Sequence, residues 1–372
     1  MSGLIRLAFV LPHLRAGGAE RVVLNYLRAL DRQRFEPFLI LGRREGAFLD
    51  RVPADVTVVG LGGVRAHRLA PRIARELAAH RIDAAYSATD AANLALLASR
   101  WWGARRTERI VSLHTNPAAW LAEAKRPKPR RWLMRRLYPT AALAVVPTDA
   151  IAAELREIVG VAPPVAVLPN PVVERITPPP PPSNPTRIVA AGRLVEAKGF
   201  DLLIEAAALL AARGRKLELT IYGEGPLRDA LVRHAAESEL RCEFPGHASE
   251  GIFERADLCV VPSRREGFGN VVVEAMAAGV PVLATACPGP AGLIDDGRNG
   301  FLVEAGSSTA LAEVMEALLA DPARRRSVLQ AAAQTARRFE VGEATRRFEQ
   351  AIERLLGNHA PPEHPDPGQA VR

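Results

Sequence analysis

Two cationic side chains, Arg193 and Lys198, lie five residues apart in a turn framed by glycines, the segment Gly192–Gly199. The turn follows a predicted strand, 187–191, and precedes a predicted helix, so both side chains stand at the carboxyl end of a strand. A planar guanidinium and a compact ammonium at such a place suit the two phosphates of a diphosphate. A solvated loop would also explain the arginine, but lysine is rare in this chain, and its placement here favours binding.

Two carboxylates stand eight residues apart in the segment 266–274, EGFGNVVVE, which follows the apolar predicted strand 258–261. Glu266 lies in a glycine-rich turn, and Glu274 lies about one turn inside the predicted helix 271–278. That spacing lets both face one crevice, and Glu274 is the only charge in an apolar helix, unlike an ordinary surface glutamate. The turn also presents backbone N–H groups at the helix start, from Gly267, Gly269 and Asn270.

Gly17 and Gly18 follow the first predicted strand, 4–11, and open a predicted helix at about 19–30. Paired glycines permit close approach of the backbone, and a helix N-terminus attracts an anion. A plain strand-to-helix turn is the alternative interpretation. The dinucleotide fingerprint G-x-G-x-x-G is absent here, which weakens the case for a dehydrogenase.

Apolar strands alternate with helices twice along the chain, which predicts an α/β protein with two doubly wound parallel-sheet domains and a cleft between them. The first domain is predicted over 1–170 and the second over 186–338, joined by a proline-rich linker, 171–185. A last helix, at about 341–356, is expected to pack back on the first domain, and the tail 357–372 is expected to be disordered. The predicted strands are 4–11, 38–41, 56–59, 84–86, 109–113, 142–146, 187–191, 217–222, 258–261 and 280–284.

Composition excludes several classes of protein. With 372 residues, of which 48% are hydrophobic and 24% charged, the chain can bury two sizeable cores and is neither fibrous nor disordered over most of its length. Three cysteines without a C-x-x-C pair leave no disulfide framework or cysteine zinc site. No apolar run approaches the roughly 18 residues of a spanning helix, so we expect a cytoplasmic protein.

The motifs, in this order, resemble the retaining glycosyltransferases of family 4, whose GT-B architecture has two facing Rossmann-like domains. In the second domain the resemblance rests on the turns at 192–199 and 266–274, on Y-G-E-G-P at 222–226 and on G-R-N-G-F-L-V at 297–303. In the first domain it rests on G-G-A-E-R at 17–21, S-L-H at 112–114 and V-L-P-N-P at 167–171. It covers nearly the whole chain, to about Leu356.

The resemblance implies a role for each matching residue of the second domain. Arg193 and Lys198 would bind the donor diphosphate, Glu274 the nucleotide ribose, and Glu266 hydroxyls of the transferred sugar. The expected donor-binding residues also include Gly223, Gly267, Phe268, Gly269 and Asn270.

In the first domain, the resemblance implies that Gly17 and Gly18 approach the phosphates or the sugar from across the cleft. His114 would lie near the reacting sugar, and with Glu266, Arg193 and Lys198 it completes the expected catalytic set. Relatives usually carry a glutamate or another polar residue near the donor sugar where this chain reads CPGPAGLI, at 287–294. The identity of the sugar therefore does not follow from the resemblance.

No D-x-D motif occurs among the thirteen aspartates. The charge of a leaving diphosphate must then be neutralised by Arg193, Lys198 and helix N-termini, so we expect no metal and no other cofactor, as the resemblance also implies. The expected reaction is retaining transfer with oxocarbenium-like character, in which the leaving diphosphate helps to take the acceptor's proton. No covalent nucleophile is assigned, and Glu266 is the candidate to exclude.

The segment 125–136, KRPKPRRWLMRR, holds seven basic residues and no acidic one. Basic residues with an interspersed tryptophan are typical of surfaces that meet anionic lipid headgroups. A solvated helix face is the alternative, and no base-stacking module indicates nucleic acid. We expect this patch to contact the cytoplasmic face of a membrane and a glycan or lipid-linked acceptor; it comprises Lys125, Arg126, Lys128, Arg130, Arg131, Trp132, Arg135 and Arg136.

The sequence thus predicts a glycosyltransferase of cell-surface polysaccharide or glycolipid synthesis, with a UDP-sugar favoured as the donor. A nucleotide-sugar epimerase of similar architecture is one alternative, against which the combination of G-R-x-x-x-x-K-G with E-x7-E speaks. A catalytically inactive sugar-nucleotide-binding protein is the other, and the otherwise intact motif set speaks against it.

Overall fold

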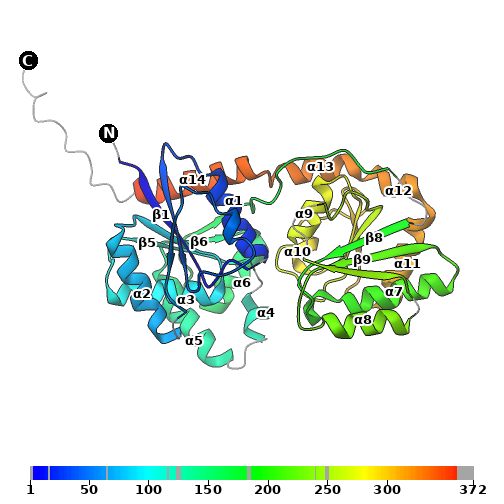
Figure 1. Ribbon diagram of the computed structural model, residues 1–372, viewed down its shortest axis with the longest axis horizontal. Coiled ribbons are helices and arrows are strands. Elements are labelled where there is room, and N and C mark those ends of the chain that lie inside the picture. Colours follow the sequence, from blue (N-terminus) through cyan, green and yellow to red (C-terminus); the bar gives the residue numbers. More distant parts are fainter. Residues whose placement is uncertain are drawn as a thin grey trace, which may run out of the picture.

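The structure is a computed structural model that describes residues 3–15, 17–63, 66–114, 117–122, 127–181, 186–238, 240–247 and 251–357. Two parallel sheets, each with helices packed around it, form two domains side by side (Figure 1). The predicted α/β class and the two doubly wound sheets are confirmed. No helix in these ranges is long and apolar enough to cross a lipid bilayer.

The first sheet has seven parallel strands in the order β3-β2-β1-β4-β5-β6-β7. Its central strands are buried on both faces, which is why they read as continuous apolar runs without alternation. The strand order reverses between β1 and β4, and ligands of such sheets bind at the carboxyl ends beside a reversal. The elements are β1 (Ile5–Leu11), α1 (Gly18–Ala29), β2 (Phe35–Leu41), η1 (Leu49–Arg51), β3 (Thr57–Gly60), α2 (Ala66–Ala79), β4 (Ala84–Ser87), α3 (Asp90–Ala98), η2 (Ser99–Trp102), β5 (Glu108–Ser112), α4 (Pro117–Ala122), α5 (Pro127–Leu137), η3 (Tyr138–Thr140), β6 (Leu143–Val146), α6 (Asp149–Val159) and β7 (Val165–Val167).

The second sheet has six parallel strands in the order β10-β9-β8-β11-β12-β13, with its reversal between β8 and β11. The loops that follow β8 and β11 carry the two charged motifs of this domain, so the reversal brings them together. The elements are β8 (Thr186–Ala191), η4 (Glu196–Lys198), α7 (Phe200–Ala212), β9 (Leu217–Tyr222), α8 (Arg228–Glu237), β10 (Cys242–Gly246), β11 (Leu258–Val261), α9 (Asn270–Ala277), β12 (Val282–Thr285), α10 (Pro288–Ala291), β13 (Phe301–Val303), α11 (Ser308–Ala320), α12 (Pro322–Ser327), α13 (Leu329–Arg337) and α14 (Val341–Gly357).

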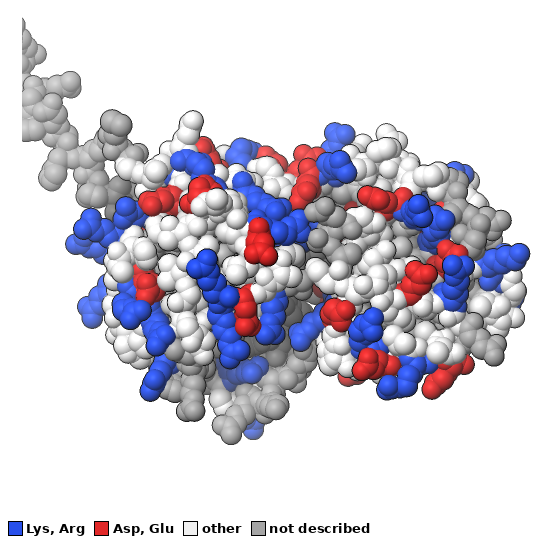
Figure 2. All heavy atoms as spheres, viewed as in Figure 1, with Lys and Arg blue, Asp and Glu red and all other residues white. Residues whose placement is uncertain are grey.

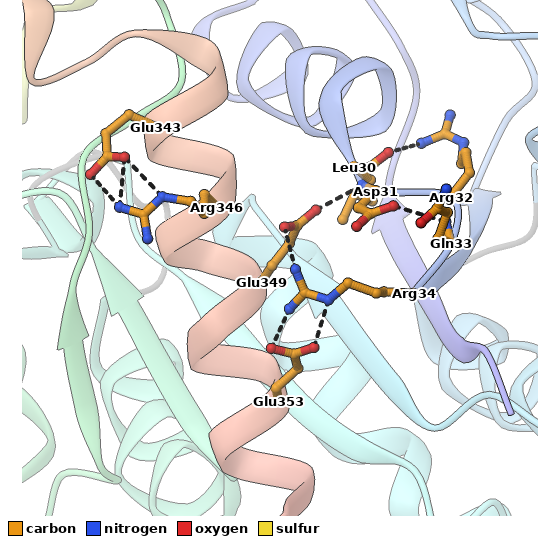
Figure 3. A network of polar contacts seen from close by, with 9 residues as sticks. All are labelled: Leu30, Asp31, Arg32, Gln33, Arg34, Glu343, Arg346, Glu349 and Glu353. Carbon is orange, nitrogen blue, oxygen red and sulfur yellow. Dashed lines mark hydrogen bonds and ion pairs between the residues drawn. The ribbon is translucent and has the colours of Figure 1, made fainter. Parts of the chain in front are cut away.

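The last helix, α14, crosses from the second domain and packs on α1 of the first (Figure 1). Phe348 stacks on Tyr26 with ring centroids 4.3 Å apart. The carboxylate of Glu349 accepts a hydrogen bond from the Asp31 N–H at 2.8 Å, and Arg34 lies between Glu349 and Glu353 (Figure 3). The chain therefore crosses between the domains twice, and aromatic and ionic contacts hold α14, which follows the second crossing, on the first domain. Residues 358–372 of the expected tail lie outside the described residues.

Three strands are absent from the sequence prediction: β7, β10 and β13. All three lie at sheet edges. β7 and β13 have only three residues each, which is too short for a recognisable pattern, and β10 is half exposed and contains glutamate and proline. The strand predicted at 280–284 begins instead at Val282, because the Val280 N–H donates back to the Ala275 carbonyl in the turn after α9.

Candidate functional site

Lys198 and Glu266 form an ion pair that joins the two charged motifs of the second domain. Lys198 ends η4, after β8, and Glu266 precedes α9; their side chains are 23% and 14% exposed. Gly199, the residue after Lys198, has a φ of +64°, and a Cβ there would lie 2.2 Å from the Pro262 carbonyl oxygen, so only glycine fits. The fold thus brings the expected diphosphate cation beside the expected sugar-binding carboxylate.

Arg193 is exposed and lies within electrostatic reach of the first domain. Burial raises the pKa of Glu20 in α1, and the Arg193 charge opposes that shift. Burial lowers the pKa of His13, and Arg193 is among the charges that lower it further. Gly17 leaves room for the Glu20 carboxylate, because a Cβ at Gly17 would lie 2.3 Å from its Oε2. The charge of this second-domain cation therefore acts on groups at the start of α1 and in the turn before it.

Gly223 supports the loop that carries Arg193. It has a φ of +140°, and a Cβ there would lie 1.9 Å from the carbonyl oxygen of Gly192. The two turns are joined by hydrogen bonds from the Gly192 N–H to Tyr222 O, at 3.0 Å, and from the Leu194 N–H to Glu224 O, at 2.9 Å. The described contacts of Gly223 are therefore those of a supporting residue.

The glycine-rich turn before α9 rests on α10. The Gly289 N–H donates to Glu266 O at 3.1 Å, and a Cβ at Gly289 would lie 2.8 Å from both Glu266 O and Phe268 N. Phe268 is 2% exposed, so its side chain belongs to the core and only its backbone is left for a ligand. Gly269, with a φ of +94°, starts the helix, and Gly267 is buried beside it. The segment 287–294 therefore supports the turn through its backbone.

Two side-chain contacts and one close approach of the backbone bring the first domain onto α9, the helix that follows this turn. Arg21 Nη1 lies 3.4 Å from Glu274 Oε1. Asn170 Nδ2 donates to Asn270 Oδ1 at 3.1 Å, and a Cβ at Gly18 would lie 3.1 Å from Asn270 Nδ2. Burial raises the pKa of Glu274, and the charge of Arg21 opposes that shift. Gly18 and Glu274, two predicted site residues that are far apart in the sequence, thus lie at one junction between the domains.

His114 follows β5 in the first domain and is half-buried. Its Nε2 lies 3.1 Å from Ser112 Oγ and 3.4 Å from Tyr86 OH, whereas its Nδ1 is buried and has no hydrogen-bond partner among the residues that the structure describes. Burial lowers the pKa of His114 to about 4, a shift that the Asn170 side chain opposes. The imidazole is therefore neutral at pH 7.

A cavity of about 660 Å³ opens beside the junction. Its lining includes Arg21, Glu274, residues between 172 and 180 of the connecting segment, and 251–254; Lys198, Glu266 and His114 do not line it. Among the residues that the structure describes, no group of three His, Cys, Asp or Glu side chains could hold a metal ion.

The basic segment lies apart from these motifs, on α5, which packs on α3, α4 and α6 (Figure 1). Lys128, Arg131 and Trp132 are exposed, with the Arg136 guanidinium 5.7 Å from the centre of the Trp132 ring. The other two described cations have intramolecular partners. Burial raises the pKa of Asp90, and the charge of Arg130 opposes that shift, while Arg135 donates a hydrogen bond to the Ile158 carbonyl oxygen. Lys125 and Arg126 lie outside the described residues. On the face shown in Figure 2, acidic side chains lie among the basic ones of both domains.

Sequence reasoning missed two residues of the junction, Arg21 and Asn170. Both stand inside motifs that were recognised, G-G-A-E-R and V-L-P-N-P. Their partners, Glu274 and Asn270, are 253 and 100 residues away along the chain, so no local spacing indicates either contact.

Comparison with known proteins supports the resemblance. The family model described as Glycosyltransferase Family 4 matches residues 16–175, and the model described as Glycosyl transferases group 1 matches residues 174–335. The two matches are consecutive and together span both domains.

Curated relatives are similar over part of their length. A D-inositol 3-phosphate glycosyltransferase of Arthrobacter sp. (strain FB24) is 38% identical over 168 residues, which are 42% of this chain and 40% of that protein. The lipopolysaccharide core biosynthesis glycosyltransferase LpsE of Rhizobium meliloti is 34% identical over 39% of this chain and 42% of that protein. This chain thus spans about two fifths of the length of these relatives.

Among solved structures, HepE of Anabaena, in complex with UDP and glucose, superposes with a TM-score of 0.75 at 21% identity. The superposition covers 94% of this chain and 100% of that one. It confirms the predicted GT-B fold. With the two family models matching in succession over residues 16–335, the chain belongs to the family 4 glycosyltransferases.

Proposed function

We propose that this protein transfers a sugar from a nucleoside diphosphate, UDP being favoured, to a glycan or lipid-linked acceptor of a cell-surface polysaccharide or glycolipid. The observation that carries the proposal is the junction where the first domain meets α9, beside the Lys198–Glu266 pair and facing Arg193. HepE has been solved with UDP and glucose, and LpsE is named for lipopolysaccharide core biosynthesis; both similarities support this choice.

In this proposal the donor diphosphate binds Lys198 and Arg193. Lys198 is already paired with Glu266, so donor binding would exchange one anionic partner for another and release the Glu266 carboxylate to accept hydrogen bonds from sugar hydroxyls. Glu274 would accept hydrogen bonds from the ribose. The cavity of about 660 Å³ that it lines is large enough for a nucleoside.

The proposed reaction retains the configuration of the sugar. The bond from the anomeric carbon to the diphosphate oxygen breaks, a bond to the acceptor oxygen forms on the same face, and the acceptor proton passes to the leaving diphosphate. Arg193 and Lys198 stabilise the negative charge that develops there. His114 is neutral, so it offers a hydrogen bond to the sugar without placing a cation beside an oxocarbenium-like centre. Glu266 is not assigned as a covalent nucleophile.

The proposal is tested by assaying release of nucleoside diphosphate from UDP-, GDP- and ADP-sugars. We expect release from one donor class, large losses in Arg193→Ala and Lys198→Ala, and none in Lys216→Ala, which removes an exposed lysine of the same domain. Two outcomes would overturn the proposal: an epimerised nucleotide sugar without release, or tight nucleotide binding without turnover on any acceptor.

We also propose that α5 docks the first domain on an anionic membrane, at its cytoplasmic face, where a lipid-linked acceptor lies. Each exposed cation near such a surface contributes about 1 kcal/mol, so several give reversible binding. Arg131→Gln with Arg136→Gln is the informative variant, because Arg130 acts on Asp90 and Arg135 donates to a backbone carbonyl, whereas Arg136 lies over the exposed ring of Trp132. We expect it to weaken co-sedimentation with phosphatidylglycerol-containing vesicles; equal binding of the wild type to neutral and anionic vesicles would reject the idea.

A further inference from the structure

Trp101 and Trp102 stand next to each other on the surface of the first domain, at the end of η2. Their side chains are 65% and 55% exposed, and their rings meet edge to face with centroids 6.4 Å apart. A single exposed apolar residue needs no explanation, but two adjacent indoles at one turn form an apolar patch that indicates a partner surface.

The turn that carries this pair is held in one shape from beneath. Arg109, 5% exposed, donates hydrogen bonds to the carbonyl oxygens of Gly103, Ala104 and Thr107, at 3.3, 3.1 and 2.8 Å, and to Ser99 Oγ at 3.2 Å. Ala104 has a φ of +50°, a left-handed conformation that is uncommon outside glycine. A buried arginine and a residue in a strained conformation thus hold the turn in one shape, and this shape keeps both indoles exposed. The exposure is therefore a property of an ordered turn and not of a frayed helix end.

Positive charge surrounds the pair. Arg100, Arg105 and Arg106 are exposed, and the segment 99–107, SRWWGARRT, has no acidic residue. Arg100 Nη1 also donates to the Thr140 carbonyl oxygen at 3.3 Å, in η3, which directly follows α5. The tryptophan turn therefore adjoins the carboxyl end of the basic helix.

We propose that the turn 99–107 is a second membrane contact, in which Trp101 and Trp102 enter the interface of an anionic phospholipid bilayer and the flanking arginines meet its phosphates. Indole suits this boundary because it is apolar in body and carries one N–H donor. The proposal rests on the docking proposed for α5 and adds to it an apolar contact that salt does not screen. Two separate points of contact also restrict the tilt of the first domain.

The spectroscopic test uses the full chain with Trp120→Phe and Trp132→Phe, which leaves this pair as the only tryptophans of the four. On vesicles of phosphatidylcholine with phosphatidylglycerol, we expect the emission to shift to shorter wavelength and to be quenched by brominated acyl chains. On phosphatidylcholine alone we expect a much smaller change. Emission that stays unshifted while the protein still sediments with anionic vesicles would overturn the proposal.

The binding test compares Trp101→Ser/Trp102→Ser with Val232→Ser, which removes an exposed apolar side chain from α8 of the second domain. At high salt we expect vesicle affinity to fall about tenfold or more in the first variant and to stay unchanged in the second. Donor hydrolysis without vesicles should match the wild type, so failure of this proposal is distinguishable from failure of the proposed activity. If the tryptophan variant instead abolishes a vesicle-independent dimer, the patch is a self-association surface and the proposal is wrong.

Discussion

Among single residues, Lys198 is the one whose removal should affect turnover much more than the stability of the fold. Its partner Glu266 keeps a partly exposed side chain, 14% accessible, so water can solvate that carboxylate when Lys198 is removed. In the proposed function the Lys198 cation is aimed at a leaving diphosphate and acts mainly on the transition state. We expect Lys198→Ala to lower turnover by about a hundredfold or more while the melting temperature changes by only a few degrees. Steady-state assays and calorimetry measure both quantities, with Lys216→Ala as the control. Rates like those of the wild type would remove the diphosphate assignment.

His114 predicts a specific dependence of stability on pH. Its pKa is about 4 in the folded protein and 6.5 in an unconstrained histidine, so the unfolded chain binds more protons between these values. The stability that neutral His114 contributes is therefore present above pH 6.5 and is lost as the pH falls towards 4. In His114→Gln, which keeps a polar group near Ser112 but does not titrate, the free energy of unfolding should fall less steeply over this range. Urea titrations at several pH values would contradict this if the two proteins changed in parallel.

Arg193 and Lys198 also predict how the protein responds to a chelator. Because two side-chain cations are assigned to the diphosphate, we expect EDTA to change the initial rate of donor turnover by less than about twofold. A larger loss that Mg²⁺ or Mn²⁺ restores would show that a metal ion shares this task.

At the scale of elements, the turns after β8 and β9 act as one unit, which Gly223 tests. With a φ of +140° and a Cβ position 1.9 Å from Gly192 O, Gly223→Ala forces the two turns apart. We expect a loss of at least about 2 kcal/mol in the free energy of unfolding, together with weaker nucleotide binding. Gly342→Ala in α14 is the control, because a Cβ there has open space and the helix gains up to about 1 kcal/mol. Equal stability of the two variants would show that the turns do not depend on this close approach.

Strands and helices can be predicted from the sequence where their burial requires a recognisable run or period of apolar residues. The predicted strands 217–222 and 258–261 are confirmed as β9 and β11, in which apolar residues such as leucine, isoleucine and valine fill the buried positions. β10 was not, because Cys242–Gly246 is half exposed and contains proline and glutamate. The charged turns were located from residue type and spacing alone, whereas the Arg21–Glu274 contact depends on how two domains meet, which no local pattern encodes.

In the whole molecule, the two domains meet where α1 approaches α9. The absence of a side chain at Gly18 allows the short distance between these two helices. A Cβ at Gly18 would lie 3.1 Å from Asn270 Nδ2, so Gly18→Ala requires a small shift and Gly18→Val a larger one. We expect turnover to fall in the order wild type, alanine, valine, while nucleotide affinity, which rests mainly on the second domain, changes by less than about threefold. Turnover assays and calorimetric titration check this. Equal turnover in the three proteins would mean that close approach of the domains is not needed for the reaction.

In the proposed function, the second domain holds the diphosphate of a nucleotide sugar on Arg193 and Lys198 while the first domain closes on it. A crystal structure of the protein soaked with UDP, or with GDP or ADP if thermal shift favours one of them, tests it most directly. We expect density for the two phosphates against Lys198 and Arg193, with the ribose on Glu274. A nucleotide bound elsewhere, or a diphosphate that leaves the Lys198–Glu266 pair intact and contacts neither cation, would contradict it.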